Sequence, residues 1–200
     1  MSKEKICKLM AEVVSDINER IVKCNNPHDK ERNRLYKPLV LIVQNACDGI
    51  LSDSKKSILE RILLCSMQVN RYNAGNCMLQ SFAVFDQLIK KFIASGLADM
   101  TTGLPIGIFT TNDHAFVMVG DLVCDSWANY VGPWEKCPFA KEKVKCYFSI
   151  SSDWVCYDNG KDYDEASTQY TYSLVEANTP VSSTADNQDN RGGASLASIK

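Results

Sequence analysis

The chain has 200 residues, of which 45% are hydrophobic and 23% are charged, and its formal net charge is −2 at neutral pH. This length is enough for one domain with a sizeable core, and the balanced composition excludes disordered, collagen-like and strongly basic nucleic-acid-binding proteins. We therefore expect a self-sufficient fold that works as a monomer without a nucleic-acid partner.

The first third of the chain is predicted to be helical. Apolar residues recur at three- and four-residue spacings over residues 4–24, which is typical of a helix packed on one face. The start of this segment is charged and amphipathic, and it lacks the apolar run and the cleavage site of a signal peptide. No window in the chain has the uninterrupted apolar length that a membrane span needs.

A polar connection containing His28 is expected over residues 25–33. A buried helix follows from Tyr36 to Leu51, although its Val-Leu-Ile-Val run also fits a strand. Ser54 is the expected N-cap of a third helix, which reaches about Val69.

The character of the chain changes after a loop over residues 71–76. A long helix is predicted to begin at Cys77 and to close near Gly96. β-rich runs separated by turn signals then predict antiparallel strands at 106–111, 114–120, 122–127, 143–150 and 169–175. We expect a catalytic domain over residues 1–175, followed by a disordered tail over 176–200, which is polar and nearly free of large apolar groups.

The nine cysteines do not indicate disulfides, because their number is odd and no Cys-x-x-Cys pair occurs. We expect a reducing compartment and core roles for most of these thiols. The predicted core thiols are Cys7, Cys47 and Cys65 in helix-like runs and Cys124 and Cys146 in strand-like runs. The two histidines have no cysteine at ligand spacing, so we expect no metal and no cofactor.

Cys77 is the candidate nucleophile. A cysteine in the first turn of a helix has its thiolate favoured by the helix dipole and by free backbone N–H groups. Ala74 and Gly75 precede it closely, so its own N–H can also help to bind an oxyanion. The alternative is that Cys77 is simply a buried thiol.

His114 and Asp125 are predicted to meet in a hairpin. If Gly120-Asp121 forms a two-residue turn, Phe116 faces Asp125 and His114 faces Trp127, so these four side chains share one face. His114 and Asp125 are then diagonal neighbours that can form a hydrogen bond. The alternative for Asp125 is a solvent-facing strand carboxylate.

A nucleophile, a base and an orienting carboxylate together predict acyl transfer at an amide. His114 would take the proton of Cys77 and later protonate the leaving amine. Gln68 and Asn70 are the candidate side-chain oxyanion donors, whereas Asn76 is expected to cap the helix.

Two further features have weaker interpretations. Trp127 either shields the His-Asp pair from water or is plain core. The segment 129–134 is placed to line a substrate cleft.

Three segments resemble a known family. Ala74-Gly75-Asn76-Cys77, His114 to Gly120 and Val123 to Ala128 are similar to the GNC, HAFVVIG and CDPWA segments of the YopT/AvrPphB-type papain-like cysteine effectors of bacterial pathogens. The resemblance spans about residues 71 to 134. Two departures are Met78-Leu79 in place of the common Gly-Glu, and Ser126 in place of proline.

The resemblance implies a papain-like α+β cysteine hydrolase fold, in which the nucleophile helix packs on an antiparallel sheet. It also implies a virulence effector that a bacterial secretion system delivers into the host cell cytoplasm, where a host protein is the substrate. Because OspI-like glutamine deamidases use a similar triad, both a thiol peptidase and a deamidase remain open. A transglutaminase-type acyl transferase and a non-catalytic binding module on the same scaffold are the alternatives.

Overall fold

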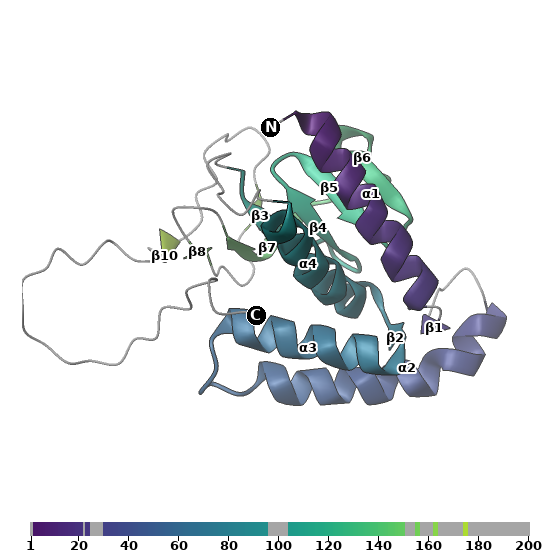
Figure 1. Cartoon of the computed structure of the whole chain (residues 1–200). Helices are drawn as coiled ribbons and strands as arrows, with labels where there is room; N and C mark the ends of the chain where they lie inside the picture. Colours follow the sequence, from purple (N-terminus) through teal and green to yellow (C-terminus); the bar gives the residue numbers. More distant parts are fainter. Residues whose placement is uncertain are drawn as a thin grey trace, which may run out of the picture.

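The computed structural model describes residues 2–21, 23–24, 30–95 and 104–150, together with three two-residue strands nearer the C-terminus. The described residues form four α-helices and a predominantly antiparallel sheet, with the helices in the first half of the chain (Figure 1). The predicted α+β class with a helical N-terminal part is thus confirmed. His28, Gly96 and the predicted tail over 176–200 lie outside the described residues.

Helix α1 spans Lys3–Arg20 and ends four residues earlier than predicted. Ile21 leaves the helical conformation, with φ −93° and ψ 66°, although its N–H still donates to the carbonyl of Ile17. Lys23–Cys24 then form a short strand, β1, which pairs in parallel with β2, Ala74–Gly75. The predicted helical end is wrong because these backbone groups pair instead with the residues that precede Cys77.

Helix α2 spans Lys30–Leu51, so it begins six residues before the predicted start at Tyr36. The predicted connection over 25–33 is wrong at its end, because lysine, glutamate and arginine are good helix formers despite their polarity. Pro38 lies inside the helix on an exposed side, while Val40, Val43 and Cys47 are buried against the neighbouring helix.

Helix α3 spans Ile58–Tyr72, and its N-cap is Ser57, not Ser54. The Ser57 side chain accepts a hydrogen bond from the backbone of Glu60, and the Glu60 side chain accepts one from the backbone of Ser57. This reciprocal capping box satisfies two backbone donors, which Ser54 is not spaced to do. The helix ends at Asn73, whose φ of 51° is left-handed.

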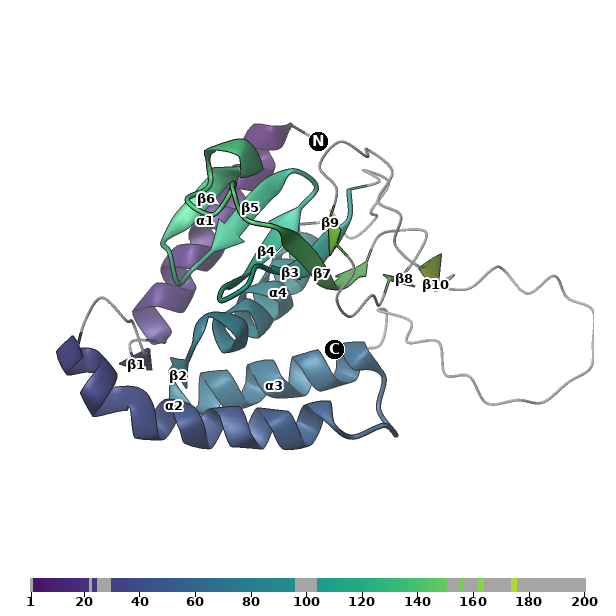
Figure 2. The same ribbon diagram turned by 180° about the vertical axis from the view of Figure 1, so that it is seen from behind.

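Helix α4 begins at Cys77, as predicted, and ends at Ala94 with Ser95 as its C-cap. It is buried on most sides, because α3 packs on one side of it and the sheet lies on the other (Figures 1 and 2). Within the described part of the chain, no helix has both the length and the apolar character to cross a membrane.

The sheet has the strand order β10-β8-β7-β3-β4-β5-β6, and β9 pairs with β7. The predicted strands at 106–111, 114–120, 122–127 and 143–150 are confirmed with shorter bounds, but β6, β8 and β9 were not predicted. The segment 169–175 is described as a strand only at its last two residues. The strands are β3 (Ile106–Thr110), β4 (Ala115–Val119), β5 (Leu122–Asp125), β6 (Tyr130–Pro133), β7 (Val144–Ile150), β8 (Val155–Cys156), β9 (Asp162–Tyr163) and β10 (Leu174–Val175).

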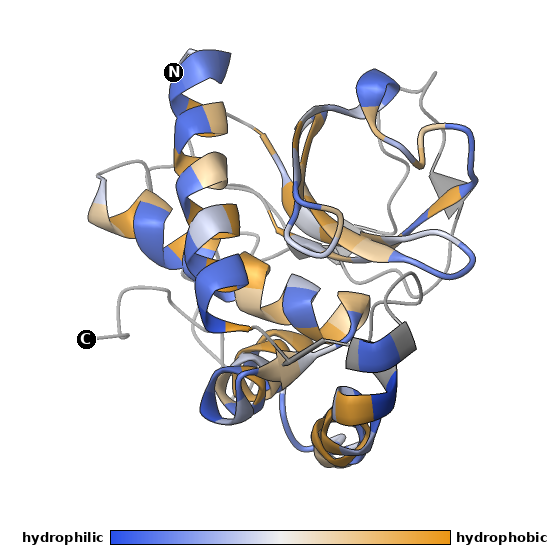
Figure 3. Ribbon diagram, turned by 90° about the vertical axis from the view of Figure 1, so that its right-hand side faces the viewer, coloured by the Kyte–Doolittle hydropathy of each residue, from blue (hydrophilic) through white to orange (hydrophobic). Residues whose placement is uncertain are grey.

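Both faces of the central strands are buried. In β4, Val117 and Val119 pack into the core shared with the helices, whereas Phe116 and Met118 face a second, smaller core that contains Trp134. This alternation follows from the two-residue period of a strand. In Figure 3, the helix α1 alternates between polar and apolar residues along its length.

Candidate active site

Cys77 occupies the first position of α4, where three neighbouring groups fix the chain. The Asn76 side-chain oxygen accepts a hydrogen bond from the Leu79 N–H at 2.9 Å, so the predicted capping role of Asn76 is confirmed. The amide nitrogen of Asn76 donates to Oε1 of Gln44 on α2 at 2.7 Å. The β1–β2 pair holds Gly75 just before it. The thiol is partly buried.

The predicted hairpin register is confirmed. Val119 pairs with Leu122 across a turn at Gly120, whose φ of 59° suits glycine, and the ladder continues to Val117 and Cys124. Beyond this point β5 ends at Asp125, because the chain turns over residues 126–129. Trp127 is therefore in a turn and does not extend the ladder opposite His114.

His114 and Asp125 form a buried pair. Nε2 of His114 lies 2.5 Å from Oδ2 of Asp125, and the two residues are only 5% and 2% exposed. The second carboxylate oxygen of Asp125 accepts a hydrogen bond from the Ala128 N–H at 3.0 Å. With both oxygens engaged, the carboxylate is held in one orientation toward the imidazole.

Cys77 lies beside the His114–Asp125 pair. Its Sγ lies 3.8 Å from the carbonyl oxygen of Asp113, the residue before His114. Burial by itself lowers the pKa of His114, but hydrogen bonds with Asp125 and Cys77, and the charges of these two groups, raise that pKa to about 9. The imidazolium form is therefore strongly favoured at neutral pH.

Aromatic side chains surround the imidazole. Its ring centroid lies 4.2 Å from that of Phe139, 5.0 Å from that of Trp127 and 5.9 Å from that of Phe116. Trp127 is half-buried, so it both packs and covers the pair. Phe139 could not be identified from the sequence, because it lies in an irregular segment without a periodic pattern.

The candidate oxyanion residues Gln68 and Asn70 lie on α3. The Asn70 amide nitrogen donates to the Ser66 carbonyl at 2.9 Å, and its oxygen accepts from Arg20 at 3.0 Å. No described hydrogen bond joins Gln68 or Asn70 to Cys77. The N–H groups of Cys77 and Met78, at the first two positions of α4, have no acceptor within the helix.

Gln80 and Ser126 form a buried contact beside these residues that the sequence did not indicate. The Ser126 hydroxyl donates to Oε1 of Gln80 at 2.9 Å, and the Gln80 amide nitrogen donates to the Gly75 carbonyl at 3.4 Å. Ser126 follows Asp125 directly, and Gln80 lies one helical turn after Cys77. Ser126, which stands where the effectors that the sequence resembles have proline, thus has a specific partner.

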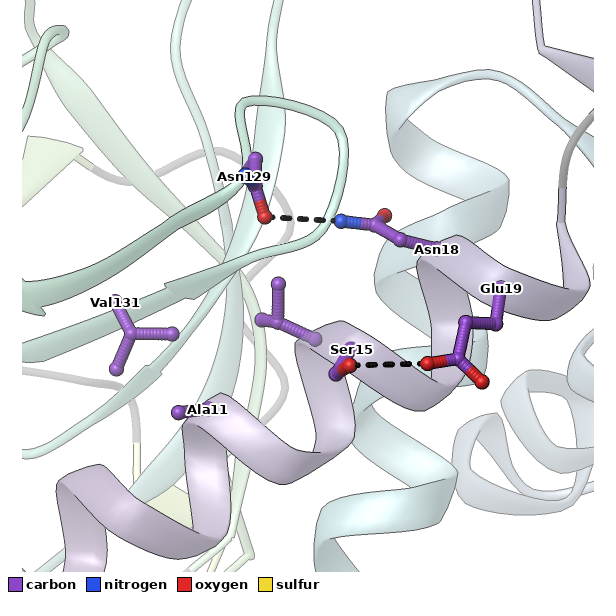
Figure 4. Close-up of a pocket in the computed structure, with 7 residues that line it drawn as sticks. Ala11, Ser15, Asn18, Glu19, Asn129 and Val131 are labelled. Carbon is purple, nitrogen blue, oxygen red and sulfur yellow. Dashed lines mark hydrogen bonds between the residues drawn. The ribbon is translucent and has the colours of Figure 1, made fainter.

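The segment 129–134 forms strand β6 and one wall of an open hollow against α1 (Figure 4). The hollow has a volume of about 500 Å³, and the Asn18 amide nitrogen donates to the Asn129 side-chain oxygen at 3.1 Å across it. Val131 packs toward the helix-side core. Strand alternation puts Asp125 on the same face as Val123, which packs into the other core, so the hollow and the His-Asp pair lie on opposite faces.

None of Cys7, Cys47, Cys65, Cys124 and Cys137 forms a disulfide, and all of these except Cys7 are buried. Burial raises the pKa of the Cys124 and Cys137 thiols, which keeps both protonated and unreactive. Across the described ranges, no three histidine, cysteine or carboxylate side chains are grouped so that they could hold a metal ion.

In a comparison with known proteins, the model of a family described as "Dot/Icm T4SS effector Ceg10" matches residues 2–179, which is most of the chain. No curated protein matches the sequence significantly.

Proposed function

Because the chain belongs to the Dot/Icm T4SS effector Ceg10 family, and is thus translocated into a host cell by a type IV secretion system, we propose that it acts there as a cysteine-dependent amide hydrolase. The observation that carries this proposal is the buried His114–Asp125 pair beside Cys77. The scaffold of the chain is papain-like, with the nucleophile helix α4 packed on the antiparallel sheet.

His114 is the base in this mechanism. Asp125 accepts the proton on Nε2, so the lone pair of the imidazole is on Nδ1, which takes the proton of the Cys77 thiol. The resulting thiolate lies at the positive end of the α4 dipole, and the imidazolium is stabilised by Asp125. The thiolate of Cys77 and the imidazolium of His114 therefore form an ion pair before the substrate binds.

The thiolate attacks the carbonyl carbon of an amide to give a tetrahedral intermediate. The unpaired N–H groups of Cys77 and Met78 are the oxyanion donors that the helix start offers. The imidazolium protonates the leaving nitrogen, and a thioester forms on Cys77. Water, deprotonated by His114, then attacks the thioester and restores the thiol.

The substrate class is a host protein, and the bond that is broken is an amide. Attack on a main-chain amide gives peptide cleavage, and attack on a glutamine side chain gives glutamate and ammonia. The same thioester would give an amine adduct if an amine replaced water, as in a transglutaminase.

Thiol labelling tests the activated nucleophile. Brief treatment of the native protein with iodoacetamide, followed by intact-mass measurement, should give a single rapid adduct on Cys77. Cys77→Ala and His114→Ala should each remove the rapid phase, whereas Cys7→Ala, which changes another partly buried thiol, should keep it. Uniformly slow labelling of the wild type would favour a non-catalytic binding module.

Product analysis identifies the reaction. A host-cell lysate incubated with wild type and with Cys77→Ala is compared by peptide mass spectrometry. New N-termini indicate a peptidase, a gain of about one dalton at glutamine indicates a deamidase, and amine adducts indicate a transglutaminase. If wild type and Cys77→Ala gave the same products, enzymatic activity toward host proteins would be contradicted.

A further inference from the structure

Gln80 lies on the helix that begins at Cys77, and its side-chain amide is buried. A buried polar side chain of this kind is unusual in a core. Gln80 is 3% exposed and lies three residues after Cys77, so the two side chains are neighbours on one helix face. An amide without partners in such a site costs free energy, so its contacts indicate what it does.

Both ends of the Gln80 amide bind parts of the candidate active site. Its nitrogen donates to the carbonyl of Gly75, two residues before Cys77, at 3.4 Å. Its oxygen accepts from the hydroxyl of Ser126, one residue after Asp125, at 2.9 Å, and Ser126 is itself only 5% exposed. One side chain therefore joins the loop before the nucleophile to the turn after the acid.

We propose that Gln80 and Ser126 form a latch, a pair of positioning residues that holds Asp125 against His114 while α4 presents Cys77. This role rests on the proposed function of the triad. Asp125 is the last residue of β5, where the ladder with β4 has already ended at Cys124 and only β6, through Tyr130, still pairs with the chain. In the turn that follows, the Ala128 N–H donates to the Asp125 carboxylate, the Asn129 N–H donates to the Ser126 carbonyl, and the latch holds the Ser126 side chain.

The latch requires glutamine at position 80, because this site needs a donor and an acceptor together. A methionine has a similar volume but provides neither, and it leaves the Ser126 hydroxyl and the Gly75 carbonyl unpaired. The titratable groups that face His114 are Cys77 from α4 and Asp125 from β5. Loosening Asp125 therefore lowers the pKa of His114, so the imidazolium beside Cys77 loses its proton at a lower pH.

A double-mutant cycle tests the latch. The rate of Cys77 alkylation by iodoacetamide is measured between pH 4 and pH 10 in wild type, Gln80→Met, Ser126→Ala and the double variant. Ser66→Ala is the matched control, because its buried hydroxyl also links two elements by donating to Asp86, but away from Cys77. Circular dichroism verifies that each variant is folded under the assay conditions.

We expect the upper inflection of the rate–pH profile, at which the imidazolium loses its proton, to move down by about one pH unit in each single variant, which is a tenfold larger acid dissociation constant of His114. The double variant should move no further, because both changes break the same hydrogen bond. Ser66→Ala should lose stability and keep the wild-type profile.

Two results would overturn the latch. If wild type labels rapidly but the single variants keep its profile, or their effects simply add, Gln80 and Ser126 do not act on Asp125. Because Ser126→Ala removes only one buried hydroxyl, this variant decides the matter if Gln80→Met does not fold. If the wild-type thiol is itself unreactive, the proposed function fails and the positioning role fails with it.

Discussion

At the scale of single residues, the strongest constraint is the charge of Asp125. A buried carboxylate needs charged or hydrogen-bonding partners, and Asp125 has His114 on one oxygen and the Ala128 N–H on the other. The same arrangement favours a proton on His114 at neutral pH. Two measurements separate the charge of this pair from its shape.

The first measurement uses Asp125→Asn. The amide keeps the shape of the side chain but removes the negative charge, so the pKa of His114 should fall from about 9 by about one pH unit or more. The chain has two histidines, so NMR titration in a His28→Gln background follows the His114 ring alone. If the pKa of His114 stayed near 9, Asp125 would not be the group that raises it.

The second measurement follows stability against pH. Because the folded pKa of His114 is raised from 6.5 to about 9, its proton stabilises the fold fully below pH 6.5, and this contribution is lost as the pH rises through 9. The free energy of unfolding should fall by at most about 3 kcal/mol over this window, at about 1.4 kcal/mol per pH unit. Urea unfolding at several pH values measures it.

The control for this experiment is His114→Gln, which should flatten the slope between pH 6.5 and pH 9. His28→Gln should keep the wild-type slope. An equal slope in wild type and His114→Gln would assign the pH dependence to other groups.

At the scale of elements, the start of α4 is held by its neighbours. Asn76 caps α4 and also binds Gln44 of α2, so a helix remote in sequence supports the position of Cys77. The β1–β2 pair adds a backbone contact from the chain that follows α1. The position of Cys77 therefore depends on three elements besides its own helix, namely α2, β1 and β2.

Asn76→Ala tests this support. It leaves the Leu79 N–H and the Gln44 oxygen without their partner, so we expect a loss of about 1 to 2 kcal/mol in the free energy of unfolding, measured by urea titration. Asn76→Ser should recover most of the capping contribution, because serine is an equally good N-cap. If alanine and serine were equally destabilising, the contact with Gln44 and not the cap would dominate.

At the scale of the whole molecule, one core connects the helices to the sheet. Residues of all four helices and of β3, β4, β5 and β7 belong to the same buried cluster. A shared core of this kind favours a single cooperative unfolding transition. The candidate catalytic side chains His114 and Asp125 lie where this unit meets the second, smaller core.

Ile17→Ala probes this cooperativity. Ile17 is fully buried on α1, and its truncation should cost about 2 to 5 kcal/mol. Far-UV circular dichroism reports mainly on the helices, and tryptophan fluorescence, measured in a Trp154→Phe background, reports on Trp127 and Trp134 beside the sheet. Both midpoints should fall together in urea, whereas two separate transitions would show that the helices and the sheet unfold independently.

Local patterns in the sequence determined the α+β class, the start of α4 at Cys77 and the register of the β4–β5 hairpin. Each depends on neighbours a few residues apart: an N-cap before an apolar run, or a two-residue turn between alternating strands. The same register predicted the contact between His114 and Asp125, because strand geometry fixes which side chains share a face.

Only the tertiary structure decided the contacts between distant segments. Phe139 against His114, Gln80 with Ser126, and the pairing of β1 with β2 join residues that have no periodic relation in the chain. The early start of α2 and the choice of Ser57 as a cap are, by contrast, local features, since polar helix formers extend α2 and a capping box with Glu60 selects Ser57. The spacing of residues predicts which secondary structure a segment can form, whereas tertiary packing selects which other segment it contacts.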